Sequence, residues 1–282
     1  MQGEKADETF GLLVIGAGRM GGALLEGLGR GGLDAARIAV VDPAPRRLPD
    51  GVRHFSGLES WAAAGVPAGA VLLAVKPQQA AGVLAGLEAL AARAPASLAD
   101  ALLISIAAGV PLAALRRTGL PAIRAMPNLP ARIRAGVTTL YADADTPAPP
   151  RRRAEALFAR VGRVIWLARE RDVDLATAVS GSGPAYVYAF AEALEAAARD
   201  LGFAPEVAAA LARQTVIGAA RLMEETGADP AALREEVTSP GGTTAAALAV
   251  FGRDRGLERL CAEALAAAAR RADELFGGEE AS

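Results

Sequence analysis

The chain has 282 residues, enough for one large domain or two modest domains with cores of their own. Hydrophobic residues make up 52% and charged residues 22%, which is typical of a globular protein, and no apolar run approaches the roughly 20 residues of a membrane span. The formal net charge of −2 argues against an electrostatic nucleic-acid binder, so we expect neither nucleic acid nor a membrane as a partner.

The counts of cysteine and histidine limit the chemistry further. Cys261 is the only cysteine, so no intrachain disulfide is possible and a reducing cytoplasm is the default location. One cysteine and one histidine are too few for a soft-metal site, so we expect no metal. The histidine, His54, follows the second predicted strand, where an exposed loop position is favoured over a catalytic one.

The first half of the chain alternates short apolar runs with helical periodicity. The runs predicted as strands are Leu12–Ile15, Ile38–Val41, Val71–Val75, Leu102–Ile106 and Ala122–Met126. Between the first two runs, apolar residues from Met20 to Leu28 keep the spacing of one helix face. Strand, helix and strand in repetition predict an α/β fold with a Rossmann-type, doubly wound parallel sheet.

The spacing of the apolar residues changes in the second half of the chain. Gly136–Tyr141 and Arg163–Leu167 flank a helix that starts near Pro149 and are predicted to extend the same sheet. After Arg169 the apolar residues follow helical stripes, so we predict a Rossmann domain over 1–168 and an all-helical domain over 169–282. Small residues along these stripes allow close helix contact, which indicates packing against another subunit.

A glycine-rich turn follows the first strand, with the sequence Gly16-Ala17-Gly18-Arg19-Met20-Gly21. Glycines at such a turn let the backbone approach a pyrophosphate, which rests on the N-terminus of the next helix. The alternative is that they only serve a tight turn, but their place between an apolar strand and an amphipathic helix favours dinucleotide binding.

The second strand ends at Asp42-Pro43, with Arg46 and Arg47 just beyond it. An acid at this position commonly binds the ribose hydroxyls of NAD, whereas a nearby arginine suits the additional phosphate of NADP. Both are present, so the choice of cofactor stays open. Asp-Pro is also an ordinary turn starter.

Three more strand ends are predicted to border the cofactor, because ligands lie beyond the carboxyl ends of parallel strands. Ala74-Val75-Lys76-Pro77 contains one of only two lysines, whose ammonium is either functional or an ordinary surface charge. Ile106–Gly109 leaves room for a ring or a ribose, and Met126-Pro127-Asn128 is placed at the nicotinamide end.

Two further motifs lie in the predicted helical domain. Ser180-Gly181-Ser182-Gly183-Pro184 could cap a long helix or allow close approach of the nicotinamide. Val237-Thr238-Ser239-Pro240-Gly241-Gly242-Thr243-Thr244 separates two helices and aims backbone N–H groups outward at a helix N-terminus. Such an array suits a carboxylate, although a plain helix–helix turn with a threonine cap is the alternative.

Together these motifs resemble those of pyrroline-5-carboxylate reductase, the family that makes L-proline. The matching blocks are V-I-G-A-G-R-M-G, A-V-K-P-Q, R-A-M-P-N, A-V-S-G-S-G-P-A-Y-V and V-T-S-P-G-G-T-T, in the family's order. The resemblance runs from about Phe10 to Leu275, and its last two blocks are much more specific than the dinucleotide fingerprint.

The resemblance implies a Rossmann domain and a helical domain that forms an intertwined homodimer, often assembled into decamers of five dimers. With the patterns above, it assigns NADPH or NADH to Ile15, Gly16, Ala17, Gly18, Arg19, Met20, Asp42, Ser56, Ala74, Val75, Lys76, Pro77, Ile106, Ala107, Ala108, Met126 and Asn128. It assigns the substrate carboxylate to Ser239 and the backbone of Gly241, Gly242 and Thr243, and the substrate ring nitrogen to Thr244.

Two positions depart from the family pattern. Leu129 stands where relatives usually have threonine, which removes any hydroxyl contact at that point. Ser56 stands where relatives often have asparagine beside the cofactor ribose.

The residues that are missing also bear on the reaction. Dehydrogenases of alcohols or carbonyls generally need a proton carrier, often His or Lys, and the predicted helical domain contains neither. An imine nitrogen is basic enough to be protonated before hydride arrives, so orientation and charge complementarity suffice. We therefore expect reduction of the C=N bond of 1-pyrroline-5-carboxylate. The alternatives are a hydroxy-acid dehydrogenase and a non-catalytic dinucleotide sensor.

Overall fold

A computed structural model describes residues 11–45 and 47–276 and divides the chain into two compact units. The sheet unit holds the described residues up to Ser182 and those from Ala269 onward, and the helical unit runs from Gly183 to Ala268. The domain boundary was predicted after residue 168, whereas the first compact unit continues to Ser182. The predicted boundary stays a prediction. Arg46 lies outside the described residues.

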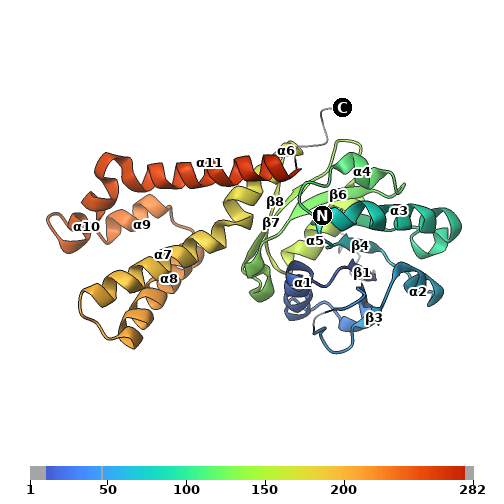
Figure 1. The fold of residues 1–282 in the computed structure, drawn as a ribbon, viewed down its shortest axis with the longest axis horizontal. Helices are drawn as coiled ribbons and strands as arrows, with labels where there is room; N and C mark the ends of the chain where they lie inside the picture. The colour runs from blue at the N-terminus through green and yellow to red at the C-terminus, as the bar shows by residue number, and fades with distance from the viewer. Residues whose placement is uncertain (1–10, 46, 277–282) are drawn as a thin grey trace, which may run out of the picture. The chain divides into compact units, whose positions relative to one another are not determined.

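Within the described residues, the sheet unit has eight strands in the order β3-β2-β1-β4-β5-β6-β7-β8 (Figure 1). The strands are β1 Leu12–Ile15, β2 Ile38–Val41, β3 Arg53–Phe55, β4 Ala70–Leu73, β5 Leu102–Ser105, β6 Ala122–Met126, β7 Gly136–Tyr141 and β8 Gly162–Trp166. Strands β1 to β6 are parallel, β7 is antiparallel to β6, and β8 is parallel to β7. The strand order reverses between β1 and β4, which confirms the doubly wound sheet.

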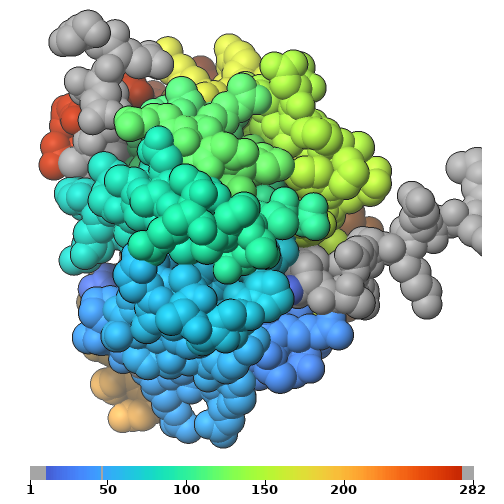
Figure 2. Space-filling view, turned by 90° about the vertical axis from the view of Figure 1, so that its right-hand side faces the viewer, coloured from blue at the N-terminus to red at the C-terminus, as the bar shows by residue number. Residues whose placement is uncertain are grey.

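Helices cover both faces of this sheet. They are α1 Arg19–Arg30, α2 Leu58–Ala63, α3 Pro77–Arg93, α4 Leu112–Arg116, α5 Ala148–Ala159 and α6 Arg171–Ala176. Shorter turns are η1 Ala35–Arg37, η2 Pro95–Ser97, η3 Leu129–Ile133 and the π-helical η4 Thr177–Gly181. On the side that carries α2, α3 and α4, the segments follow one another in sequence from blue through cyan to green (Figure 2).

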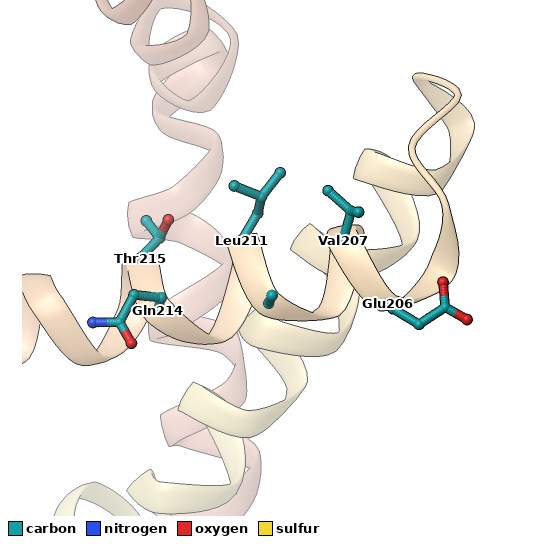
Figure 3. A pocket seen from close by; sticks show the side chains of 6 residues that line it. Glu206, Val207, Leu211, Gln214 and Thr215 are labelled. Atoms are coloured by element: carbon teal, nitrogen blue, oxygen red, sulfur yellow. The ribbon is translucent and has the colours of Figure 1, made fainter.

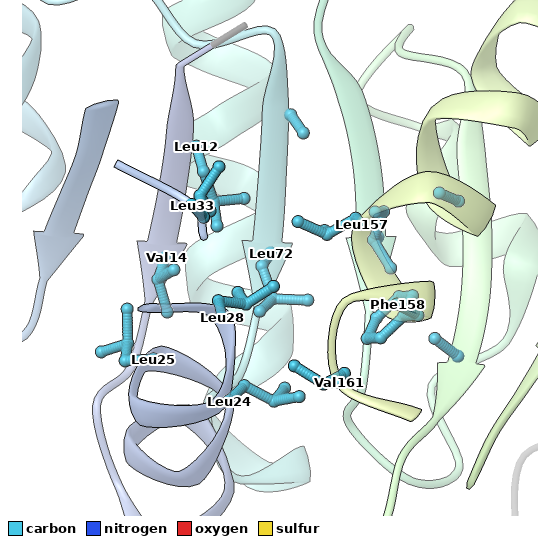
Figure 4. Close-up of a cluster of buried hydrophobic side chains, with 14 of the residues drawn as sticks. Leu12, Val14, Leu24, Leu25, Leu28, Leu33, Leu72, Leu157, Phe158 and Val161 are labelled. Carbon is cyan, nitrogen blue, oxygen red and sulfur yellow. The ribbon is translucent and has the colours of Figure 1, made fainter. Parts of the chain in front are cut away.

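The core of the sheet unit consists of two apolar layers, because alternate residues of a strand point to opposite faces. Leu12 and Val14 of β1 pack with Leu28 of α1 and Phe158 of α5 in one layer (Figure 4). The intervening residues of β1 pack with α2, α3 and α4 in the other, around the fully buried Trp61. Four-residue strands buried on both faces explain why the sequence shows continuous apolar runs instead of alternation.

The structure corrects the predicted strands in three respects. β4 begins one residue and ends two residues earlier than predicted, β5 ends one residue earlier, and β8 both begins and ends one residue earlier. β7 and β8 extend the sheet as predicted, but β7 runs antiparallel to β6. β3 was not predicted, because its three residues are exposed or half-buried and two of them are charged or polar. His54 therefore lies in an edge strand, exposed, and the loop assignment was wrong.

The helical unit consists of α7 Gly183–Asp200, α8 Pro205–Thr226, α9 Pro230–Glu236, α10 Thr243–Gly252, η5 Arg253–Arg255 and the first part of α11 Gly256–Phe276. Pro205 opens α8, and Gly202 takes a φ of +95° just after α7, as predicted. Helix α11 continues past Ala268, so its last turns belong to the sheet unit.

The helices of this unit leave apolar side chains uncovered. Among the described residues, α7, α9 and α10 contain no buried residue, and α8 contains two, Ala208 and Ala212. Val207, Leu211 and Thr215 project from one side of α8, and both aliphatic side chains are close to half exposed (Figure 3). None of the helices in the described ranges has the length and apolar character needed to cross a membrane.

Candidate active site

The glycine-rich turn joins β1 to α1 with little space around its backbone. Gly16 has a φ of +98°, and a Cβ atom there would lie 2.7 Å from the carbonyl oxygen of Ala74. Only glycine fits this position, because L side chains rarely adopt that φ. A Cβ at Gly18, the N-cap of α1, would meet nothing within 4 Å, and no side chain caps the helix. The first N–H groups of α1 are therefore open to an anion.

Asp42 lies directly beside this turn. Its Oδ2 accepts a hydrogen bond from the backbone N–H of Ala17 at 2.7 Å, and its Oδ1 accepts from the N–H of Ala44 at 2.9 Å. The Nε2 of His54 lies 2.8 Å from the carbonyl oxygen of Asp42. Ser56 follows β3 at the same edge and is exposed. Asp42 thus begins a local turn and also contacts the fingerprint, while its binding of a cofactor ribose stays a prediction.

The ends of β4 and β5 continue the same edge. The N–H of Ala74 donates to the carbonyl of Ile15 at 2.8 Å, and the N–H of Ile106 donates to the carbonyl of Leu73 at 3.0 Å. The segments Ala74–Pro77 and Ile106–Ala108 therefore leave the sheet next to the fingerprint turn. Lys76 occupies the N-cap position of α3 without a side-chain capping bond, and it is exposed.

Asn128 lies just beyond the end of β6 and is 6% exposed. Its Nδ2 donates to the carbonyl of Ser180 at 3.0 Å, and its Oδ1 accepts from the N–H of Val137 at 3.0 Å. The side chain thus ties the end of β6 to η4, the π-helical turn that carries Ser180 and Gly181. Met126 is buried in β6, and the cofactor contacts assigned to both residues stay predictions.

Arg124, in the middle of β6, was missed by the sequence reasoning. It is buried and bonds both carboxylate oxygens of Asp174, with N–O distances of 2.6 and 3.2 Å. It also bonds Glu170 at 3.1 Å, and the same Glu170 oxygen accepts from the N–H of Leu112 at 2.7 Å. The sequence did contain a signal for these ion pairs, namely one arginine inside an apolar predicted strand. A charged side chain has to be paired when it is buried.

A second ion pair spans the start of α6. Arg169 donates to the two carboxylate oxygens of Asp172 at 2.7 and 3.1 Å. These hydrogen bonds hold the pKa of Asp172 below its ordinary value and raise the pKa of Arg169. The pair stabilises the entry to the helix that carries Asp174.

The loop between α9 and α10 has a compact geometry. Gly241 has a φ of +69°, and the N–H of Gly242 donates to the carbonyl of Ser239 at 3.0 Å. A Cβ at Gly242 would lie 2.6 Å from the Oγ of Ser239. No side chain caps α10, whose ten residues carry no charge. Its first N–H groups, at Thr243 and Thr244, are therefore open to an anion.

The site residues fall into two sets. The residues assigned to the cofactor line the carboxyl edge of the sheet unit, where the strands β1, β2, β3, β4, β5 and β6 end. Ser239, Gly241, Gly242, Thr243 and Thr244 lie together in the helical unit. In that loop, Ser239, Gly241 and Thr243 are exposed, while Gly242 and Thr244 are half-buried.

The sheet topology and the fingerprint define a dinucleotide-binding oxidoreductase. Residues 11–109 match the family described as NADP oxidoreductase coenzyme F420-dependent. Residues 170–275 match the family described as pyrroline-5-carboxylate reductase dimerisation.

Comparison with whole proteins narrows the class. The chain is 41% identical to the pyrroline-5-carboxylate reductase of Pseudomonas aeruginosa, over 94% of this chain and 96% of that protein. It is 37% identical to the pyrroline-5-carboxylate reductase of Haemophilus influenzae, over 85% of this chain and 88% of that protein. A solved pyrroline-5-carboxylate reductase from Coxiella burnetii superposes with a TM-score of 0.82 at 36% identity, covering 95% of this chain and 98% of that one. The solved pyrroline carboxylate reductase of Plasmodium falciparum, which has NADP bound, superposes with a TM-score of 0.79 at 26% identity. The match covers 95% of this chain and 99% of that one. The chain belongs to the pyrroline-5-carboxylate reductase family.

Proposed function

We propose that this chain reduces the C=N bond of 1-pyrroline-5-carboxylate to L-proline with NADPH or NADH, the last step of proline biosynthesis. The observation that carries the proposal is the uncapped N-terminus of α10 behind the Ser239–Thr244 loop. A carboxylate is the ligand that such an array of N–H groups favours. The identity to relatives along nearly the whole chain supports the same substrate.

The sheet unit offers the groups that would hold the dinucleotide. Its pyrophosphate would rest on the open N–H groups of α1 beyond Gly18, and the segments Ala74–Pro77 and Ile106–Ala108 would flank it. When bound, the reduced nicotinamide supplies the hydride. The remaining assigned residues at this edge, Met126 and Asn128, are proposed to border the nicotinamide end.

The helical unit would hold and orient the substrate. We assign the carboxylate to Ser239 and the backbone N–H groups of Gly241, Gly242 and Thr243. The Thr244 hydroxyl would donate to the ring nitrogen or orient it. No histidine or lysine exists in this part of the chain, and none is required, because the imine nitrogen takes its proton readily. Fixing the carboxylate beside a positive helix end would instead favour the reactive orientation.

The test is to follow the absorbance of NADPH or NADH when 1-pyrroline-5-carboxylate is added to purified protein, and to identify the product. Loss of absorbance with formation of L-proline is the expected result. Dinucleotide binding without turnover of the imine would overturn the proposal.

Thr244→Ala should lower kcat about 100-fold while leaving dinucleotide affinity unchanged, within the range for an oriented proton donor. Thr226→Ala is the matched control, because its hydroxyl bonds its own helix at the carbonyl of Leu222. Unchanged turnover in Thr244→Ala would remove that residue from the mechanism.

The match to a dimerisation family indicates a homodimer, and the half-exposed apolar side chains of α7 and α8 are consistent with a subunit interface. We propose a decamer of five dimers as the complete assembly and the cytoplasm as its location. Light scattering after size-exclusion chromatography gives the mass directly. A species no larger than the dimer at micromolar concentration would exclude the decamer.

A further inference from the structure

The side chain of Asn128 bonds two segments outside its own turn. Asn128 is the N-cap residue of η3, a place where an asparagine side chain ordinarily caps the helix, but here it makes no capping bond. Its Oδ1 instead accepts from the N–H of Val137, and its Nδ2 donates to the carbonyl of Ser180, both at 3.0 Å. These partners fix the orientation of the amide, because an N–H requires the oxygen and a carbonyl requires the nitrogen.

The carbonyl of Ser180 cannot take the usual α-helical donor. That donor would be the N–H four residues further on, and the residue there is Pro184, which has none. The turn around Ser180 is π-helical, with the N–H of Ser182 donating to the carbonyl of Thr177, five residues back, at 2.8 Å. Because Ser180 is half-buried, a carbonyl without a partner would be costly there. Asn128 supplies a donor from another part of the sheet unit.

Two residues on one face of the β6 segment hold the α6–η4 segment. Arg124 and Asn128 lie on the same face with Met126 between them, because alternate residues of an extended chain point to one side. Arg124 bonds Asp174 in α6, and Asn128 bonds Ser180 in η4. The π-helical turn is therefore anchored on both sides, and such turns are frequent at functional sites.

The place of η4 in the sheet unit relates it to one half of the dinucleotide. A doubly wound sheet binds a dinucleotide across its switch point, with one mononucleotide on each half. The switch lies between β1 and β4, and the half with β2 and Asp42 is the one assigned to adenosine. The carboxyl end of β6, where Asn128 bonds η4, belongs to the other half, which would take the nicotinamide.

We propose that Asn128 is a positioning residue, which sets the nicotinamide end of the site for hydride transfer by holding the backbone of Ser180 and Gly181. The inference rests on the proposed function. It gives Asn128 a role that acts through η4 in place of a side-chain contact with the cofactor. Loss of the bond to Ser180 should disturb the nicotinamide end and leave the adenosine half intact.

Two variants remove this bond in different ways. Asn128→Asp keeps the shape and the oxygen for Val137 but cannot donate to Ser180 when it is ionised, whereas Asn128→Leu is of similar size and removes both bonds. At neutral pH each should lower kcat by about 10- to 100-fold, as expected for misplaced reactants. Calorimetry should show unchanged affinity for ADP-ribose, or for its 2′-phosphate if the wild type binds that form, because neither contains nicotinamide. An unchanged kcat, or an affinity that falls in step with kcat, would contradict the proposal.

The pH profile of Asn128→Asp distinguishes positioning from general support of the fold. Burial raises the pKa of an aspartic acid, and its protonated form can donate to the carbonyl of Ser180 again. The ratio of its kcat to that of the wild type should therefore rise as the pH falls from about 8 to about 5.5, while the ratio for Asn128→Leu stays constant. A ratio for Asn128→Asp that is flat or falls on acidification would overturn the proposal.

The other charged and titratable groups on this side of the sheet are the same in all of these proteins. Neighbouring strands and the ion pairs place there Arg124, Tyr141, Arg163, Glu170 and Asp174. Dividing by the value for the wild type removes their common effect on the pH profile.

Thr139→Val is the matched control. Thr139 lies in β7 opposite Met126, is 5% exposed, and its hydroxyl has no hydrogen-bond partner within the described part of the chain. The isosteric valine should therefore leave kcat unchanged. Hydrogen exchange without any cofactor gives an independent measurement, because the amides of residues 177–182 should lose protection in both Asn128 variants and keep it in Thr139→Val. Unchanged protection in both Asn128 variants would overturn the proposal.

The proposed function and this inference fail separately. Wild-type protein that binds the dinucleotide without reducing 1-pyrroline-5-carboxylate would overturn the function alone. In that case the fluorescence of bound NADH still tests Asn128: emission that moves toward that of free NADH in the variants supports the inference, and unmoved emission overturns it. Wild-type turnover in both Asn128 variants would overturn the inference and leave the function standing.

Discussion

The two units of the chain differ in how much of their apolar surface they bury. In the sheet unit, strands such as β1 are fully buried between two layers of helices, and large side chains such as Trp61 and Phe158 are almost inaccessible. In the helical unit, Tyr188 and Leu260 remain 58% and 63% exposed. The first unit completes its own core. The second presents an apolar surface of the kind that marks an interaction site, in agreement with its match to a dimerisation family.

The largest effect is expected from the core of the sheet unit. Phe158 is 1% exposed, so Phe158→Ala should lower the free energy of unfolding by about 3–5 kcal/mol. The loss should be the same at low and high protein concentration, because the layer is completed within one chain. Chemical denaturation at two concentrations measures it.

The matched variant is Phe190→Ala in α7, where the same side chain is 47% exposed. In a single chain its removal would change stability little. Its loss of stability should therefore grow with protein concentration if a second subunit covers α7. A large loss of stability that does not depend on protein concentration would mean that Phe190 is buried within its own chain. The contrast between the two units would then be wrong.

A somewhat smaller effect is expected at Arg124. Arg124→Met removes the cation between Asp174 and Glu170 and leaves two carboxylates at the edge of the core, which should lower stability by about 3 kcal/mol. The double variant with Asp174→Asn should recover part of this loss. Thermal denaturation of the wild type, the two single variants and the double variant completes this double-mutant cycle. Additive losses of stability would show that Arg124 and Asp174 do not interact energetically.

The smallest effect is expected at the Arg169–Asp172 pair at the start of α6. The pKa of Asp172 is lowered in the folded state by Arg169, so the pair stabilises the protein above the ordinary pKa of aspartate. This contribution is lost as the pH falls through the lowered pKa. The melting temperatures of the wild type and Asp172→Asn should therefore differ slightly near neutral pH and converge in acid. A difference that widens on acidification would contradict this sign.

The contrast between the units also explains what the sequence could predict. Continuous apolar runs identified β1, β2, β6 and β7 with their bounds, and the glycine-rich turn was found because its spacing has one strong geometric use. The α9–α10 loop was likewise found, because Pro-Gly-Gly between two helical segments marks a sharp break. The residue roles assigned at these places remain predictions.

What the sequence could not predict depends on partners that are distant along the chain. The ion pairs of Arg124 join residues 46 and 50 positions apart, and no local pattern specifies them. The amide of Asn128 is used to hold the carbonyl of Ser180, which is 52 positions away. β3 is too short and too polar to carry a period of its own, and it exists because β2 offers it a free edge.

Helix α11 has a consequence for how the protein is made on the ribosome. Its residues before Ala269 belong to the helical unit, while its later turns bury Ala272 within the sheet unit, with an Arg171–Asp273 contact of 3.8 Å nearby. The sheet unit is therefore built from two pieces of chain separated by the whole helical unit. Its strands can pair early in translation, but its final packing has to wait until residue 276 has emerged. Truncation before α11 would accordingly remove the second piece of the sheet unit together with the last part of the helical unit.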